Sequence, residues 1–256
     1  MITLTINGKL VKAEPGEMLL KVIRREKIDI PAACHHDSVE PHGGCRLCTV
    51  EITHKDWKGW KGQVTSCLYP VEEGLVVGTH TPQVIELRKT ILDLYLARSP
   101  QSEVVRGWAQ EYGIVQTSFE TIPDGNDCIL CSLCTRVCDQ MGFHAISAAG
   151  RGHGKEIAPP LWQAPEACVG CLACANVCPT NYIKYTDKGG TREIWGKKFE
   201  LLKCEKTGAP TVTREFADHL SKHRNIPAEY FKLGDKAHRT ETAMTMGKIA
   251  NWQKKG

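Results

Sequence analysis

The pattern of apolar and polar residues predicts a hairpin and then a helix at the start of the chain. Residues 2–6 alternate, Asn7-Gly8 is a strong two-residue turn signal, and residues 9–14 return as the partner strand. Residues 18–27 carry apolar side chains at helical spacing, and residues 49–52 alternate again as a strand. A small mixed unit of strands and one helix is therefore expected first.

Further along the chain, apolar residues recur at helical spacing in some segments and lose this spacing in the tail. Residues 82–97 and 103–112 are predicted helices, and the first begins at Pro82, a residue suited to a first turn. Residues 148–162 are rich in Gly and Pro and are predicted to form a loop. A further helix is predicted for residues 213–223, with Thr213 as its N-cap. The rest of the tail is polar and weakly periodic.

Composition narrows the class of protein. A chain of 256 residues with 41% hydrophobic content suggests one or two domains, and its net charge of +4 is spread along the sequence, which argues against a nucleic-acid partner. No apolar run approaches the ~20 residues that a membrane span needs. Thirteen cysteines without an export signal favour metal binding in a reducing compartment. We therefore expect a cytoplasmic protein.

One cysteine pattern occurs twice in the second half of the chain. Each copy reads C-x2-C-x2-C-x3-C, and Pro179 follows the second copy. This run holds [4Fe–4S] clusters in bacterial two-cluster ferredoxins, where the fourth cysteine of each run ligates the other cluster. The predicted ligands are Cys128, Cys131, Cys134 and Cys178 for one cluster, and Cys138, Cys168, Cys171 and Cys174 for the other.

Four earlier cysteines have the spacing C-x10-C-x2-C-x18-C and suit a [2Fe–2S] cluster. Gly43-Gly44 would let the backbone approach the cluster sulfides closely. A zinc site is the alternative, although zinc ribbons usually pair two C-x2-C knuckles and this set has one. His35, His36 and His42 are expected to face solvent or to contact the ligands. The predicted ligands are Cys34, Cys45, Cys48 and Cys67.

One cysteine remains after three sets of four. Cys204 could join His219 and His223, which are spaced i, i+4, in a metal site. A free buried thiol is the simpler interpretation, because unliganded cysteine is among the most buried residue types. Cys204 is therefore left without an assigned role.

The order of these motifs resembles a known family over residues 1–186. It is similar to the diaphorase small subunit of soluble NAD-linked hydrogenases and to the N-terminal part of the large iron–sulfur subunit of respiratory NADH dehydrogenase. The matching segments are residues 30–35, 44–51, 79–82, 131–139 and 178–180. The resemblance implies an α+β chain with a β-grasp [2Fe–2S] domain (1–80), a helical linker (81–122), a two-[4Fe–4S] ferredoxin domain (123–186) and a C-terminal extension (187–256).

The resemblance also implies a function. Such a chain would carry electrons between an FMN/NADH-binding subunit and a second redox subunit of hydrogenase, formate dehydrogenase or benzoyl-CoA reductase type. Neither a G-x-G-x-x-G fingerprint in strand-to-helix context nor a Ser/His/Asp constellation is present, so no substrate-converting site is expected here. The extension, poor in apolar residues, is expected to contact a partner subunit. A free ferredoxin-like carrier and a zinc-stabilised interaction protein are the alternatives.

One feature of the family is missing from the sequence. Members usually carry a further [4Fe–4S] site with one His and three Cys ligands between the two cluster domains. The corresponding residues 97–108 contain neither His nor Cys, so this cluster is predicted to be absent. The two cluster domains must then lie close together, or a partner must supply an intermediate cofactor.

Overall fold

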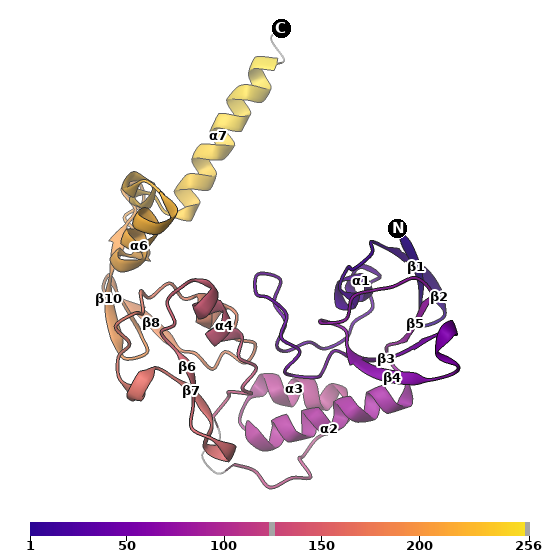
Figure 1. Ribbon diagram of the computed structural model, residues 1–256. Coiled ribbons are helices and arrows are strands. Elements are labelled where there is room, and N and C mark those ends of the chain that lie inside the picture. Colours follow the sequence, from indigo (N-terminus) through magenta and orange to yellow (C-terminus); the bar gives the residue numbers. More distant parts are fainter. Residues whose placement is uncertain (123–125, 254–256) are drawn as a thin grey trace.

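The computed structural model describes residues 1–122 and 126–253. Figure 1 shows four parts in succession: an N-terminal sheet, a pair of helices, a cysteine-rich part with short elements, and a C-terminal sheet that carries the last helices. This mixture of helices and sheets confirms the predicted α+β class.

The N-terminal part is a mixed five-stranded sheet. Its strands are β1 (Ile2–Ile6), β2 (Lys9–Ala13), β3 (Thr49–His54), β4 (Lys61–Thr65) and β5 (Leu75–Gly78), with the 3₁₀ turn η1 (Lys55–Trp57) between β3 and β4. The order is β2-β1-β5-β3-β4. Asn7 and Gly8 both have positive φ (49° and 82°), as the predicted hairpin turn requires. The helix α1 (Leu19–Arg25) buries its apolar face against this sheet.

Two helices follow where they were predicted. The first, α2 (Pro82–Arg98), is capped by Thr81, whose hydroxyl accepts the N–H of Val84 at 3.4 Å. The second, α3 (Glu103–Glu111), is capped by Ser102 in the same way. The caps satisfy N–H groups that a helix leaves free in its first turn.

Arg88 of α2 fastens the helix pair to the sheet. Its side chain is fully buried, with Nε donating to the Leu47 carbonyl at 3.0 Å and Nη2 to the Thr49 carbonyl at 2.9 Å. These carbonyls belong to the turn after Cys45 and to the start of β3. A charged side chain thus occupies a position inside the apolar stripe of a helix.

The cysteine-rich part is built from short elements. They are α4 (Leu133–Gln140), β6 (Ser147–Ala149), η2 (Gly152–Gly154), β7 (Glu156–Ala158), η3 (Pro160–Trp162) and α5 (Ala173–Asn176). The segment predicted as a loop therefore contains a two-stranded sheet, β6-β7. Gly150 allows this turn, because it has φ 72° and a Cβ there would lie 2.6 Å from the Gly154 carbonyl oxygen.

The C-terminal extension contains a sheet that the polar sequence did not predict. Its elements are β8 (Tyr185–Lys188), β9 (Thr191–Ile194), β10 (Lys197–Lys203), β11 (Pro210–Thr213), α6 (Arg214–Arg224), η4 (Ala228–Lys232) and α7 (Asp235–Gln253). The strand order is β11-β10-β9-β8. The predicted helix is confirmed as α6, capped by Thr213. In Figure 1, α7 projects away from the rest of the chain.

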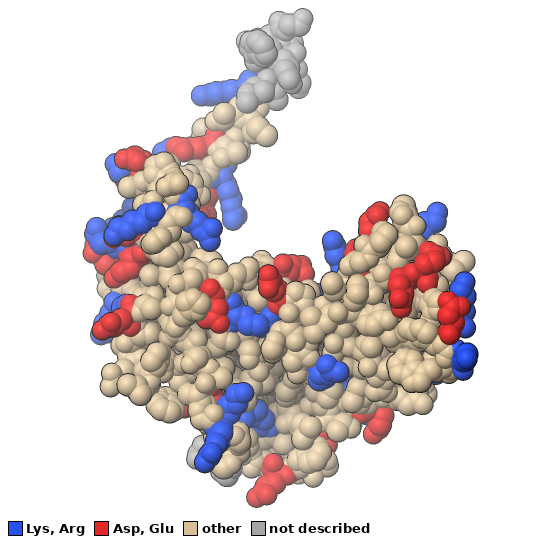
Figure 2. Space-filling model, viewed as in Figure 1, with Lys and Arg blue, Asp and Glu red and all other residues tan. Residues whose placement is uncertain are grey.

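Charged side chains of both signs lie side by side over the C-terminal part and the N-terminal sheet in Figure 2. The surface between these parts is largely uncharged in the same view. No helix among the residues that the structure describes is long and apolar enough to cross a membrane.

Replacing Arg88 with alanine is expected to lower the free energy of unfolding by roughly 3 kcal/mol, because two buried carbonyls lose a charged donor. Urea denaturation under anaerobic conditions measures the change. Arg106→Ala, an exposed arginine on α3, is the control and should change stability by less than about 0.5 kcal/mol. Equal losses in the two variants would contradict the assigned role of Arg88.

Candidate metal centres

The first four cysteines lie together and are almost fully buried. Their thiols face each other in two pairs, Cys34 with Cys45 and Cys48 with Cys67. The hydrogen bond from Cys45 lowers the pKa of Cys34, and that from Cys67 lowers the pKa of Cys48. Two pairs of thiols match a cluster in which each of two irons takes two thiolates.

The loop before Cys45 is shaped around the sulfur of Cys34. The N–H of Cys45 donates to that sulfur at 3.4 Å, and the N–H of Gly44 also points to it. Gly43 has φ 69°, and a Cβ there would lie 2.5 Å from Cδ1 of Leu68. Glycine is therefore needed at the turn, and the N–H donors favour a negatively charged sulfur.

The three histidines of this loop have other contacts. Nδ1 of His35 lies 3.2 Å from Nη1 of Arg24, and Nδ1 of His36 accepts the N–H of Ser38 at 3.1 Å. His36 and His42 are exposed. These positions agree with side chains that face solvent or neighbouring residues.

The two copies of the C-x2-C-x2-C-x3-C run follow the same backbone path. Leu130 and Gly170 have φ of 53° and 68°, and Ser132 and Leu172 have φ of 59° and 64° just before α4 and α5. Turns of this kind direct successive N–H groups into a concave surface that favours anions. The sequence repeat is thus a repeat of conformation as well.

The structure groups these thiols across the two runs. One group contains Cys128, Cys131, Cys134 and Cys178. The other contains Cys138, Cys168, Cys171 and Cys174. Burial raises the pKa of the first three thiols of each run, and the charge of the fourth cysteine of the other run adds to this effect. The groups coincide with the predicted ligand sets, whose ligation stays a prediction.

The fourth cysteines also have matching donors. The sulfur of Cys138 accepts the N–H of Ala145 and that of Cys178 accepts the N–H of Tyr182, both at 3.3 Å. In each copy the residue before the donor has positive φ: His144 with 48° and Asn181 with 54°. These N–H groups would stabilise thiolates bound to iron.

Tyr95 of α2 lies beside thiols of two different sets. It packs in one buried cluster with Cys34, Cys45 and Cys131, and its hydroxyl donates to the Cys45 carbonyl at 3.4 Å. Burial raises the pKa of Tyr95, and the nearby charges of these three cysteines add to the effect. The [2Fe–2S] set and the first [4Fe–4S] set are therefore neighbours.

Arg136 of α4 joins the same two parts. Its Nη2 donates to the Cys34 carbonyl at 2.7 Å, and its Nη1 donates to the Glu40 carbonyl. After the bond from Cys45, the charge of Arg136 is a further cause of the low pKa of Cys34. Val39 of the same loop packs against apolar residues of α4. The predicted helical linker thus does not hold the two parts away from each other.

The chemistry of the donor sets fits iron–sulfur clusters. All thirteen cysteines are free thiols. Within the described residues, no three His, Cys, Asp or Glu side chains are placed to hold a single metal ion. Cluster ligands surround an inorganic core instead of one ion, and buried thiols with N–H donors aimed at sulfur suit that arrangement.

Cys204 lies apart from these sets. Its thiol is buried, and a hydrogen bond with Thr207, followed by the N–H of Gly234, lowers the pKa of Cys204 to about 7. The ring centroids of His219 and His223 lie 4.5 Å apart with the rings tilted by 33°, and His219 also packs on Phe143. The structure therefore does not gather Cys204 and these histidines into a metal site.

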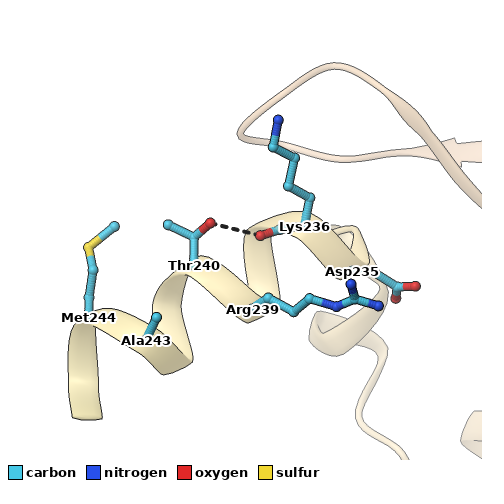
Figure 3. A pocket seen from close by; sticks show the side chains of 6 residues that line it. All are labelled: Asp235, Lys236, Arg239, Thr240, Ala243 and Met244. Atoms are coloured by element: carbon cyan, nitrogen blue, oxygen red, sulfur yellow. Dashed lines mark hydrogen bonds between the residues drawn. The ribbon is translucent and has the colours of Figure 1, made fainter. Parts of the chain in front are cut away.

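A hollow on α7 contains no cysteine (Figure 3). All of its lining residues come from this one helix, and Thr240 Oγ1 donates back to the Lys236 carbonyl at 2.9 Å. The lining residues are Asp235, Lys236, Arg239, Thr240, Ala243 and Met244. An open hollow on a single helix does not enclose a ligand, and we assign it no function.

Known families match both cysteine-rich parts of the chain. Residues 1–82 match the 2Fe-2S iron-sulfur cluster binding domain, and residues 122–185 match the 4Fe-4S dicluster domain. The chain is 28% identical over 214 residues to the NADP-reducing hydrogenase subunit HndD of Solidesulfovibrio fructosivorans. It is 31% identical over 207 residues to the NADPH-Fe(3+) oxidoreductase subunit alpha of Geobacter sulfurreducens. The chain therefore carries the domains of two iron–sulfur families and resembles subunits of NADP-linked hydrogenases and oxidoreductases.

The family resemblance seen in the motifs is thereby confirmed. Each of these two matches covers 72% of this chain but only 36% and 24% of the relative, so the chain spans about a third or less of their length. A solved structure of an NAD+-reducing [NiFe]-hydrogenase in the H2-reduced state is also similar, with 26% identity and a TM-score of 0.53. That match covers 62% of this chain and 74% of the hydrogenase chain.

Sequence patterns missed the residues that connect the sites. Tyr95 lies in the predicted helix at residues 82–97 and Arg136 in the matching segment 131–139, but neither was assigned a role. Ile194 and Trp195 of the extension line the second [4Fe–4S] group, which the weak periodicity there gave no reason to expect. The available signal was the glycine after Trp195, because a two-residue turn that ends in Gly indicates a hairpin.

Changing Cys67 to serine is expected to remove the [2Fe–2S] cluster and two of about ten irons per chain. Cys204→Ser is the matched control and should keep the full iron content. Iron and acid-labile sulfide analysis, with electron paramagnetic resonance of the reduced protein, measures both. Full iron in the Cys67 variant would show that the first set does not bind a cluster.

Proposed function

We propose that this chain is an electron-transfer subunit of a multisubunit NAD(P)H-linked oxidoreductase in the cytoplasm. It would hold one [2Fe–2S] cluster on the first four cysteines and two [4Fe–4S] clusters on the two groups from the repeated run. When bound, these clusters supply one-electron redox steps. The thiol grouping, the N–H donors aimed at sulfur and the two matched domains support this assignment.

The observation that carries the proposal is the contact between the first two sets. Cys34 and Cys131 belong to different sets but share one buried cluster with Tyr95, and Arg136 ties the Cys34 carbonyl to α4. These residues keep water out and fix the separation of the two sites. Electrons could then pass between them without the one-His, three-Cys cluster that residues 97–108 cannot bind.

The role of each residue follows from its contacts. Arg98 Nε donates to the Cys128 carbonyl at 2.8 Å, so α2 positions the first [4Fe–4S] loop as well as packing on the first set through Tyr95. The same helix carries Arg88 against the start of β3. A single rigid helix therefore touches both sites, which would keep the distance between them constant.

We infer that the partners are an FMN- and NAD(P)H-binding subunit and a second redox subunit. The relatives named above act on NADP, NADPH or NAD+, and two of them are hydrogenase proteins. A hydrogenase, a formate dehydrogenase or a reductase of benzoyl-CoA type is the proposed terminal partner. The exposed Met244 and Met246 of α7 support a chain that works inside a complex.

Anaerobic purification of the tagged chain from its native host is expected to bring a flavin-containing, nicotinamide-binding protein with it. NADH or NADPH should then reduce all three clusters in the complex but none in the isolated chain. In a complex that carries Cys67→Ser, NAD(P)H should no longer reduce the [4Fe–4S] clusters. A chain that stays monomeric in extracts would favour a free ferredoxin-like carrier, and a colourless zinc-loaded chain would exclude both redox functions.

A further inference from the structure

We propose that Trp195, in the sheet of the C-terminal extension, closes the second [4Fe–4S] site and donates its indole N–H to the sulfur there, which raises the reduction potential of that cluster. The inference rests on the proposed function, since it requires a cluster on Cys138, Cys168, Cys171 and Cys174. It assigns the extension a role within this chain.

The backbone at Trp195 is the first observation. Ile194 pairs with Lys197, so Trp195 and Gly196 alone form the turn between β9 and β10, with φ of 53° and 73°. A two-residue turn with both φ positive favours Asn-Gly, and a bulky residue in this left-handed region costs about 1 kcal/mol or more. The preceding turn of the same sheet uses Gly189-Gly190. Such strain is kept only where the surroundings require it.

The position of the indole is the second observation. Trp195 lines the same pocket as the four cysteines of the second group, and the other lining residues are all apolar. Its Nε1 is buried and has no hydrogen-bond partner among the described residues. Cys174 lines this pocket together with Trp195, so the indole lies near the sulfur of the second group. A buried donor without an acceptor costs about 1–3 kcal/mol, and cluster sulfur would supply the acceptor.

The attachment of the sheet is the third observation. Lys197 Nζ donates to the Cys168 carbonyl at 2.7 Å, and Arg192 Nη1 donates to the Gly170 carbonyl at 3.0 Å. Phe199 packs so closely on Gly170 that a Cβ there would lie 2.9 Å from the ring. Asp187 holds Arg192 through two bonds of 2.8 Å. The sheet is thus fixed on the loop of the second site, and this attachment determines where Trp195 points.

The direction of the effect follows from charge. Reduction adds one negative charge to a cluster, so an N–H donor at its sulfur stabilises the reduced form more than the oxidised form. The positive charge of Lys197, whose Nζ donates to the Cys168 carbonyl, acts in the same sense. The indole ring at the same time excludes water and oxidants from this side.

Trp195→Phe keeps the apolar cover and removes the donor. In a redox titration followed by electron paramagnetic resonance, the reduced-to-oxidised ratio of one [4Fe–4S] cluster at fixed potential should fall about tenfold, a negative shift of about 59 mV for a one-electron couple. The other two clusters should keep their potentials. Trp60→Phe, an exposed tryptophan on the N-terminal part, is the matched control and should shift none.

Trp195→Asn distinguishes the protection that the indole gives the second site from any contribution of the indole to folding. Asparagine suits the turn, so the variant should melt no lower than the parent, while iron is lost from the second site several-fold faster in air. The inference would be overturned if Trp195→Phe binds full iron with unchanged potentials, or if Trp195→Asn loses iron no faster than the parent. Either result would leave the proposed function standing. A parent chain that binds no iron would instead refute the proposed function.

Discussion

Burial of thiols is the constraint on which this structure depends. A thiolate in apolar surroundings is costly, and burial is the largest cause that raises the pKa of Cys134 and Cys174 in the repeated run. The chain offsets the cost with backbone N–H groups, which need left-handed residues such as Ser132 and Leu172 at matching positions. Metal binding must still displace protons, so folding of these loops and cluster insertion depend on each other.

The same constraint explains how the two cysteine-rich parts meet. The loop from Cys34 to Cys45 has exposed histidines on one side and buried sulfur on the other, and Arg136 closes the buried side against α4. A guanidinium is a suitable group there, because it can donate to more than one carbonyl oxygen while its charge favours nearby thiolates. The family's additional cluster is therefore dispensable for contact between the remaining sites, since Tyr95 and Arg136 fill the space between them.

Local features were predictable from the sequence, and tertiary ones were not. Asn7-Gly8 and Pro82 determine a turn and a helix start through their backbone conformation, and Thr213 does so through its capping hydroxyl. These elements therefore lie where they were predicted. The cysteine spacing likewise predicts three ligand sets, and their ligation of iron stays a prediction. Two tertiary features depend on residues distant in sequence, so no local pattern predicts them. They are the burial of Arg88 between α2 and the N-terminal part, and the contact of Tyr95 with two of the cysteine sets.

The extension shows why a polar, weakly periodic segment can still fold. Its sheet shares an apolar core around Phe199 with the cysteine-rich part, and polar bonds join it to carbonyls of the loop that carries Cys168. Those carbonyls are in place only when that loop has its native path, which ligation by iron would fix. The sheet should therefore order together with the second site. Since α6 follows β11 directly and leads through η4 to α7, the direction in which α7 projects depends on the same loop.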